Sequence, residues 1–193
     1  MGFRLSVQPI LPIGKETLVY GSNDGGMNYQ SINEEANKIM NAVGNHLYLK
    51  AHICRDKQEQ AHLIVGPGDI EIHRGTDGNI YAIDVARLMP PDLNAKKPNS
   101  IFYQNFRPEF LKWYRKPLSS DAYSKFTSGD GDLDDKEAYI ASKVLRENRI
   151  PKFASMIKPP EDKKPSFNWV TEEMKNRGIN ARFLAIKHPK SSI

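Results

Sequence analysis

Histidine, asparagine and aspartate side chains in one short stretch could do chemistry. His73, Asn79 and Asp84 all lie within residues 66–91. In enzymes that transfer phosphoryl groups, Asn and Asp side chains hold the magnesium ions that bind the phosphates of the nucleotide. One hypothesis is therefore a kinase-like nucleotide-binding or phosphotransferase domain with Asp84 as magnesium ligand. The sequence has neither the HRD nor the DFG pattern of protein kinases, so this hypothesis rests on residue types alone.

A β-hairpin would have to position these residues. The dipeptide Asp77-Gly78 suits the tight turn between two antiparallel strands, and alternating apolar residues flank it on both sides. We expect the arms to run over Asp69–Arg74 and Asn79–Leu88. Because strand side chains alternate between two faces, Asp84 would share its face with small aliphatic residues. The pattern therefore predicts a buried carboxylate at position 84.

A buried carboxylate needs a cation or hydrogen bonds, because removing it from water is costly. Arg87, Arg74 and His73 are the nearby candidates. A structural role at the strand ends is the stronger interpretation, although buried carboxylates also occur in active sites. The expected structural hairpin set is Asp77, Gly78, Asp84 and Arg87.

The five histidines and the single cysteine show no spacing typical of a metal site. There is no HxH or HxxxH pattern and no second cysteine, so we expect no metal and no cofactor. Cys54 has His52 and Arg55 beside it, which makes a nucleophile conceivable. A small buried hydrophobe is the stronger interpretation of this residue.

Aromatic and basic residues interleave between Phe102 and Lys125. Stacking on rings together with neutralisation of phosphates is how proteins bind single-stranded RNA. The alternative is an amphipathic helix with its aromatic residues in the core and its cations in solvent. The candidate RNA-binding residues are Arg107, Lys112, Arg115, Lys116 and Tyr123.

Positive charge is concentrated in the second half of the chain. The net charge is +5 overall, but residues 1–92 hold 8 Lys or Arg against 11 Asp or Glu, and residues 93–193 hold 20 against 12. Such asymmetry suggests a polyanionic partner, and solubilising lysines on exposed helices would explain it equally well.

The 193 residues fit one domain, which we expect over residues 1–188, with 189–193 as a frayed tail. No apolar run approaches the ~20 residues that span a bilayer. The N-terminus lacks the features of a signal peptide, and one cysteine suits a reducing compartment, so a cytoplasmic protein without membrane insertion is expected.

The predicted fold is α+β, with a mostly antiparallel sheet and packed helices in the first half and a mainly helical second half. Ser31 and Glu34 form a capping box that predicts the first helix. We expect further strands near Tyr48–Ile53 and His62–Val65, and later helices beginning near Pro108 and over Asp134–Asn148 and Val170–Arg177. Ile150-Pro151 should break or restart the second of these later helices, and Asn180–Ile186 should be a strand or a short helical segment.

Four stretches in order resemble the Clu domain of the clustered mitochondria protein family. They are LPIGKETLVYGSNDGG (Leu11–Gly26), GPGDIEIHRGTDGNIYAIDVARLMPPD (Gly66–Asp92), RPEF with KPLSSDAYSKF (within Arg107–Phe126), and RGINARFLAIKH (Arg177–His188). The resemblance runs across nearly the whole chain.

The resemblance implies a non-enzymatic module of a cytoplasmic protein that governs the intracellular distribution of mitochondria. It also implies binding of mRNAs that encode mitochondrial proteins and, in fungi, association with translation initiation factor 3. Family members carry further domains on a longer chain, which would be partners of this one. The family supplies no catalytic residues to transfer.

Overall fold

The structure is a computed structural model that describes residues 8–93, 103–126, 131–158 and 166–185. The expected tail over 189–193 lies outside these ranges. The first half contains η1 (Lys15–Thr17, a 3₁₀ turn), β1 (Leu18–Gly21), α1 (Glu34–Leu47), β2 (Ala51–Arg55), β3 (Ala61–Val65), β4 (Glu71–Arg74) and β5 (Ile80–Ile83). The second half contains α2 (Pro108–Tyr114), α3 (Gly131–Lys143), η3 (Val144–Arg149, π-helical), α4 (Ile150–Met156), α5 (Phe167–Asn176) and η4 (Ala181–Ala185, 3₁₀).

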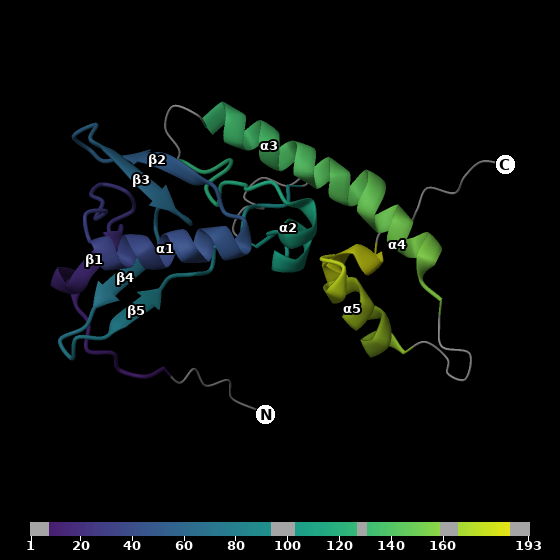
Figure 1. Cartoon of the computed structure of the whole chain (residues 1–193), viewed down its shortest axis with the longest axis horizontal. Coiled ribbons are helices and arrows are strands. Elements are labelled where there is room, and N and C mark those ends of the chain that lie inside the picture. The colour runs from purple at the N-terminus through teal and green to yellow at the C-terminus, as the bar shows by residue number, and fades with distance from the viewer. Residues whose placement is uncertain (1–7, 94–102, 127–130, 159–165, 186–193) are drawn as a thin grey trace, which may run out of the picture.

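The fold is α+β, as the sequence predicts. The strands and α1 occupy one end of the molecule, α4 and α5 lie toward the other, α2 lies between them, and α3 runs along the middle past α2 toward α4 (Figure 1). The five strands form two antiparallel sheets in the first half, and most helices lie in the second half. None of the helices in the described ranges has the length and apolar character needed to cross a membrane.

A three-stranded sheet in the order β1-β4-β5 contains the predicted hairpin. Its turn is closed by the Gly75 amide, which donates to the Asn79 carbonyl at 2.8 Å. Gly78 has a φ of 83°, a left-handed conformation that glycine adopts without strain. The turn is confirmed, but the arms are shorter than expected, because the pairing runs only from Glu71 with Ile83 to the turn.

The strands β2 and β3 form a separate two-stranded ribbon, close to the ranges that the sequence predicts. Alternate residues of the ribbon are buried, as expected for strands with one face on the core. His52 and Cys54 of β2 therefore point to the same side, together with His62 and Ile64 of β3.

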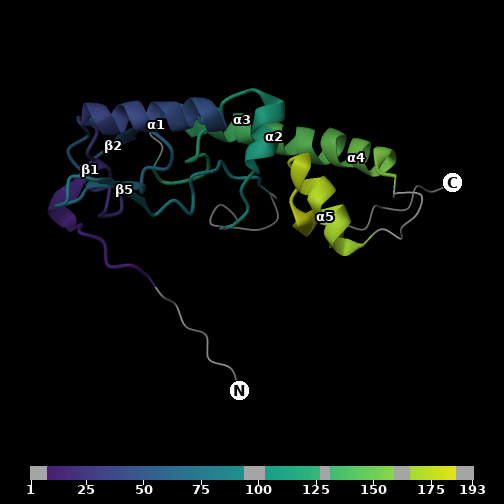
Figure 2. The same cartoon turned by 60° about the horizontal axis from the view of Figure 1, so that its bottom comes forward.

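The first helix, α1, is confirmed, but it is capped by a different residue than predicted. Asn33 Oδ1 accepts a hydrogen bond from the Ala36 amide at 2.9 Å. Ser31, the predicted cap, instead lies with its Oγ 3.0 Å from Nδ1 of His62. In Figure 2 the helix lies across the strands, and it contacts β1, β3 and α2. The buried side of α1 thus covers the sheet region.

The long helix of the second half continues through Pro151. We predicted a helix over Asp134–Asn148 that Ile150-Pro151 breaks or restarts, whereas the observed helix starts three residues earlier and passes from α3 through η3 into α4. In η3 the Ile150 amide donates to the Leu145 carbonyl, five residues earlier. Proline has no amide hydrogen and its ring crowds the carbonyl of the preceding turn, and the wider π turn accommodates both effects.

The last helix, α5, starts three residues before the predicted range Val170–Arg177, because the Ser166 side chain caps it. Gly178 follows with a φ of 74°, and a Cβ there would lie 2.3 Å from the backbone nitrogen of Phe110. Only glycine permits this close approach of the helix end to α2. The segment predicted over Asn180–Ile186 contains the 3₁₀ turn η4, so the helical alternative is the observed one.

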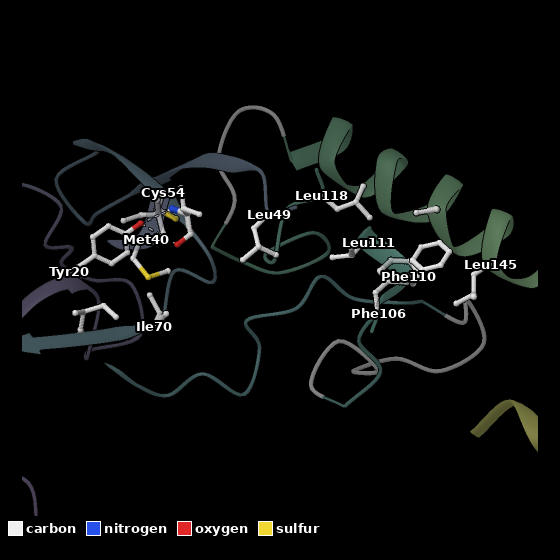
Figure 3. Packing of buried hydrophobic residues seen from close by; sticks show 14 of the residues in the cluster. Tyr20, Met40, Leu49, Cys54, Ile70, Phe106, Phe110, Leu111, Leu118 and Leu145 are labelled. Carbon is white, nitrogen blue, oxygen red and sulfur yellow. Dashed lines mark hydrogen bonds between the residues drawn. The ribbon is translucent and has the colours of Figure 1, made fainter. Parts of the chain in front are cut away.

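The apolar core is one cluster, and the residues drawn in Figure 3 gather toward its two ends. One group lies among the strands and α1, the other lies around α2 and the long helix, and Leu49 lies between them. The labelled members are Tyr20, Met40, Cys54 and Ile70 in the first group and Phe106, Phe110, Leu111, Leu118 and Leu145 in the second.

Asp92 connects the two halves of the chain through buried ion pairs. Its carboxylate is fully buried and contacts Arg146 at 2.8 Å and Arg182 at 2.5 Å. Arg146 belongs to η3 and Arg182 to η4. Because an unpaired buried carboxylate costs several kcal/mol, this pairing holds the end of the sheet region against the helices.

Tyr20 offers a test of this packing through its pKa. Its buried hydroxyl accepts from the Val65 amide at 2.6 Å, and burial raises the pKa of Tyr20 to about 12. The folded pKa lies above the ordinary value near 10, so this contribution to stability is complete below pH ~10 and is lost as the pH rises toward ~12. We expect the protein to lose roughly 2 to 3 kcal/mol over that interval relative to Tyr20→Phe. Urea unfolding of both proteins across the interval measures the difference, and parallel pH profiles would contradict the prediction.

Candidate functional site

A fully buried acid, Asp121, lies in the loop of residues 118–126 that follows α2. The loop holds this residue by local hydrogen bonds. The Asp121 amide donates to Ser119 Oγ at 3.2 Å, and the Asp121 carbonyl accepts from the Ser124 amide at 2.9 Å. Hydrogen bonds within the loop itself therefore hold the backbone on both sides of the acid.

The Asp121 carboxylate contacts three segments of the first half. Its Oδ2 accepts a hydrogen bond from the Gly68 amide at 2.7 Å and lies 2.9 Å from His52 Nε2. Its Oδ1 accepts from Arg87 Nη1 at 3.1 Å. Both oxygens thus have partners, which is what a buried carboxylate requires.

Arg87 completes the charge balance around this acid. Its guanidinium also binds Asp69 with two nitrogens, with Nε 3.1 Å from Oδ2, and lies over the Phe126 ring at 5.0 Å from the centroid. A planar guanidinium suits such bidentate contacts and ring stacking. Arg87 therefore joins the hairpin stretch to the 118–126 loop.

His52 lies in β2 between Asp121 and Cys54, whose Sγ is 3.4 Å from the same Nε2. Burial alone would lower the pKa of His52, but the hydrogen bonds and charges of Asp121 and Cys54 outweigh it and raise the pKa to about 10. The other ring nitrogen, Nδ1, is buried and has no hydrogen-bond partner in the described part of the chain. We call Asp121, His52, Cys54, Asp69 and Arg87 the Asp121 cluster.

Tyr29 closes one side of the cluster. Burial, then the neighbouring Cys54 and the carboxylates of Asp121 and Asp69, raise the pKa of Tyr29, so its hydroxyl stays protonated. A Cβ at Gly68 would lie 3.0 Å from this hydroxyl and 3.2 Å from Asp121 Oδ2. Glycine at position 68 thus lets the backbone approach the cluster closely.

The geometry excludes a cysteine nucleophile of the triad type in this cluster. In a triad, the acid orients one ring nitrogen of the histidine and the other nitrogen takes the nucleophile's proton. Here Asp121 and Cys54 both face Nε2 of His52, and Cys54 has no exposed surface. What the arrangement offers instead is a nitrogen, a sulfur and a carboxylate oxygen that converge within 4.8 Å of one another.

Comparison with known proteins shows which family the first half of the chain is similar to. Residues 1–94 match the family model described as Clustered mitochondria. The chain is 32% identical over 98 residues to the Clustered mitochondria protein homolog of Anopheles gambiae, covering 48% of this chain and 7% of that protein. It is 27% identical over 139 residues to the Clustered mitochondria protein of Arabidopsis thaliana, covering 69% of this chain and 10% of that protein. No solved structure matches the chain.

Residues 1–94, just under half of the chain, are similar to the Clu family. This confirms the resemblance on which the sequence analysis relied. The Arabidopsis match covers 69% of the chain, so it extends beyond residue 94. The matched regions make up only 7% to 10% of the length of these Clu-type relatives.

The Asp121 cluster joins two of the stretches that carry the Clu resemblance. Gly68, Asp69 and Arg87 belong to the stretch over residues 66–92, and Asp121 belongs to the stretch over 107–126. The contacts among them connect parts of the chain that are up to 53 residues apart. These contacts pack the two stretches on one another.

The prediction that Asp84 is buried is wrong. Asp84 is exposed and has a φ of 54°, so the extended strand ends one residue earlier and the alternation of faces does not reach it. Partial burial, then the charges of Asp69 and Glu71, raise its pKa. Arg87, the expected partner, pairs with Asp69 and Asp121 instead. The buried acid is real, but it is Asp121.

The three side chains of the magnesium hypothesis do not share a site. His73 is buried, with Nδ1 2.9 Å from Thr17 Oγ1. Asn79 lies in the hairpin turn, where its Nδ2 donates to Asp77 Oδ2 at 2.9 Å. Asn79 and Asp84 lie at opposite ends of β5, roughly 15 Å apart at the rise of a strand. Nothing in this arrangement favours a kinase-like role.

The five candidate RNA-binding residues divide into separate sets. Arg107 precedes α2 and forms an ion pair with Glu109 at 3.0 Å. Tyr123 is exposed in the 118–126 loop, where its amide donates to the Asp135 carboxylate, an acidic neighbour unsuited to a phosphate. The exposed cations Lys112, Arg115 and Lys116 lie on the last turn of α2 and just after it.

Sequence reasoning missed His52 and Asp121 as members of one site. The available signal was His52-x-Cys54 on a strand, because residues two apart point to the same face. Asp121 carried no comparable signal, since it is 69 residues from His52 and its loop has no periodicity. Only the packing of the two halves brings these side chains together.

Asp121→Asn tests the structural weight of the cluster, with Asp84→Asn as the matched control. We expect Asp121→Asn to lower the free energy of unfolding by about 3 to 5 kcal/mol, because Arg87 and His52 lose a buried partner. The same change at exposed Asp84 should stay within about 0.5 kcal/mol, and Asn tolerates its positive φ. Urea unfolding followed by circular dichroism measures both. Equal effects of the two changes would contradict the central role of Asp121.

A fragment of residues 1–94 provides a second test. It contains the whole region that matches the family model but lacks Asp121 and the arginines that bind Asp92. We expect it not to fold cooperatively, since Arg87, Asp92 and His52 would lose partners that they have in the full chain. Thermal unfolding and hydrogen exchange of the fragment and the full chain give the comparison. A protected, cooperatively unfolding fragment would contradict this expectation.

Proposed function

We propose that this chain is a non-enzymatic module of a Clu-type protein that binds mRNAs for mitochondrial proteins and contributes to the distribution of mitochondria in the cytoplasm. The support is the match of residues 1–94 to the Clustered mitochondria family model and to relatives of that name. We propose further that residues 1–188 form one domain. Because its relatives are much longer, other domains of a longer chain and the translation machinery are the proposed protein partners.

The observation that carries the RNA-binding proposal is a cationic surface at the end of α2. Lys112, Arg115 and Lys116 are exposed, and none of the three has an ion-pair partner among the residues that the structure describes. We call these three residues the α2 basic surface. Side chains that are neither buried nor paired within the protein are available to an external anion.

An aromatic ring lies beside this surface. Trp113 of α2 is 41% exposed, and the Arg149 guanidinium lies over its ring at 4.3 Å from the centroid. Phe110 and Leu111 of the same helix are buried, so the helix presents its cations and this ring away from the core. Proteins bind single-stranded RNA with cations that neutralise its phosphates and with aromatic rings or guanidinium groups that stack on its bases. The end of α2 offers both kinds of group.

Neutralising two cations of the α2 basic surface tests this proposal. We expect single-stranded RNA from a mitochondrial-protein transcript to bind the chain with an affinity that falls as salt rises. In Arg115→Gln/Lys116→Gln the slope of log affinity against log salt should decrease by about 1.4, since each contact to a single strand contributes about 0.7. Fluorescence anisotropy over a range of salt concentrations measures both.

The matched control is Lys38→Gln/Lys57→Gln, which makes the same charge change at two exposed residues of the first half. This variant should keep the slope of the unaltered chain. If the unaltered chain shows no salt-dependent binding, or if the two double variants behave alike, RNA binding by the α2 basic surface is refuted.

A further inference from the structure

Three side chains of the Asp121 cluster have the chemistry of metal ligands. His52 Nε2, Cys54 Sγ and Asp121 Oδ2 lie within 4.8 Å of one another, and all three residues are buried. An imidazole nitrogen, a thiolate and a carboxylate oxygen are the ligands that zinc takes in proteins. This grouping depends on β2, which directs His52 and Cys54 to one side, and on the 118–126 loop, which brings in Asp121.

Two of the three distances between ligand atoms are close to those of a tetrahedral zinc site. With zinc bonds of about 2.0 to 2.1 Å to nitrogen or oxygen and about 2.3 Å to sulfur, neighbouring ligand atoms should lie about 3.3 to 3.6 Å apart. Nε2 and Sγ are 3.4 Å apart, and Nε2 and Oδ2 are 2.9 Å apart. Sγ and Oδ2 lie within 4.8 Å of each other, so the ion would draw these two ligand atoms to their bonding distances.

The surroundings orient the carboxylate toward this point. Arg87 binds Oδ1 of Asp121 at 3.1 Å and the Gly68 amide binds Oδ2 at 2.7 Å, so the side chain cannot rotate away. Such outer contacts are typical of metal ligands, which are held by a second set of hydrogen bonds. Asp121 is thus already placed as a ligand.

The two ring nitrogens of His52 have different surroundings. Nδ1 is buried without a hydrogen-bond partner in the described residues, whereas Nε2 faces both Asp121 Oδ2 and Cys54 Sγ. Nε2 is therefore the nitrogen that would coordinate an ion, and Nδ1 would keep the ring proton.

We propose that His52 Nε2, Cys54 Sγ and Asp121 Oδ2 bind a zinc ion that ties β2 to the 118–126 loop. On binding, two protons leave to solvent: the thiol proton of Cys54, so that the sulfur coordinates as thiolate, and the proton that Nε2 of His52 carries toward Asp121, so that the imidazole coordinates in its neutral form with its remaining proton on Nδ1. A solvent molecule would take the fourth position, as at zinc sites with three protein ligands. The ion stabilises the loop that follows the α2 basic surface, and this role does not depend on RNA binding.

Cobalt(II) and zinc titrations of the full 193-residue chain test the proposal. The protein is first treated with chelator, dialysed and kept under a non-thiol reductant. Cobalt should then give a sulfur-to-metal charge-transfer band and tetrahedral ligand-field bands that saturate at one ion per chain. Zinc should displace cobalt and raise the melting temperature by about 5 °C or more at concentrations 100-fold above its dissociation constant.

Variants distinguish this site from binding elsewhere. Cys54→Ala should lose the charge-transfer band and the zinc-dependent shift. His62→Gln is the matched control, because His62 is also buried and pairs with Cys54 in the ribbon, but its two nitrogens already lie 3.0 Å from Ser31 and 3.2 Å from Asp56. It should keep both signals.

The result for the unaltered chain decides the proposal even if a variant fails to fold. Absence of the charge-transfer band, or of any zinc-dependent shift, overturns it. A zinc-dependent shift that persists in Cys54→Ala places the ion at other residues and overturns it equally.

Discussion

The carboxylate of Asp121 has no contact with water, and this constraint determines much of the surrounding structure. A charge in such a position must be met by donors from every side, because its burial otherwise costs several kcal/mol. The donors come from β2, from the turn after β3 and from the segment after β5. The observed position of the loop after α2 therefore depends on contacts with three parts of the sheet region.

Asp92 is a second buried carboxylate that requires partners, and here the acid is in the first half and its partners are in the second. It lies at the end of the first half, and its two arginine partners come from η3 and η4. The two acids hold the halves together from both sides. Asp121 belongs to the second half and pairs with residues of the first, whereas Asp92 belongs to the first half and pairs with residues of the second. The region that matches the Clu family model ends at residue 94, but the buried charge of Asp92 is paired with Arg146 and Arg182, which lie beyond that point. We therefore regard the matched region as part of a larger folding unit.

The Asp121 cluster and the α2 basic surface have different roles. The cluster stabilises the fold, and the basic surface is available for contact with a partner. Asp121, His52 and Cys54 of the Asp121 cluster are buried, which excludes them from direct contact with a large ligand such as RNA. The α2 basic surface is open, and the helix that carries it is anchored by Phe110 and Leu111. The 118–126 loop, which carries Asp121, begins shortly after Lys116 of the α2 basic surface. Fixing that loop limits how far the end of α2 can move.

The sequence by itself determined what depends on neighbours in the chain. The Asp77-Gly78 turn, the alternation in β2 and β3, the period of α1 and the stop of α5 at Gly178 were all predictable, because backbone preference and side-chain periodicity act over a few residues. The first residues of α1 and α5 were harder to predict, because residues next to Asn33 and Ser166 could equally well have capped these helices.

Only the tertiary structure decided which acid is buried. Alternation along β5 pointed to Asp84, and a single positive φ placed that residue in solvent. The acid that is buried, Asp121, is 34 residues from Arg87 and 69 from His52. Such contacts arise from the packing of separate elements, and no local pattern records them. The sequence specified that the charged residues exist, and the fold decided which of them meet.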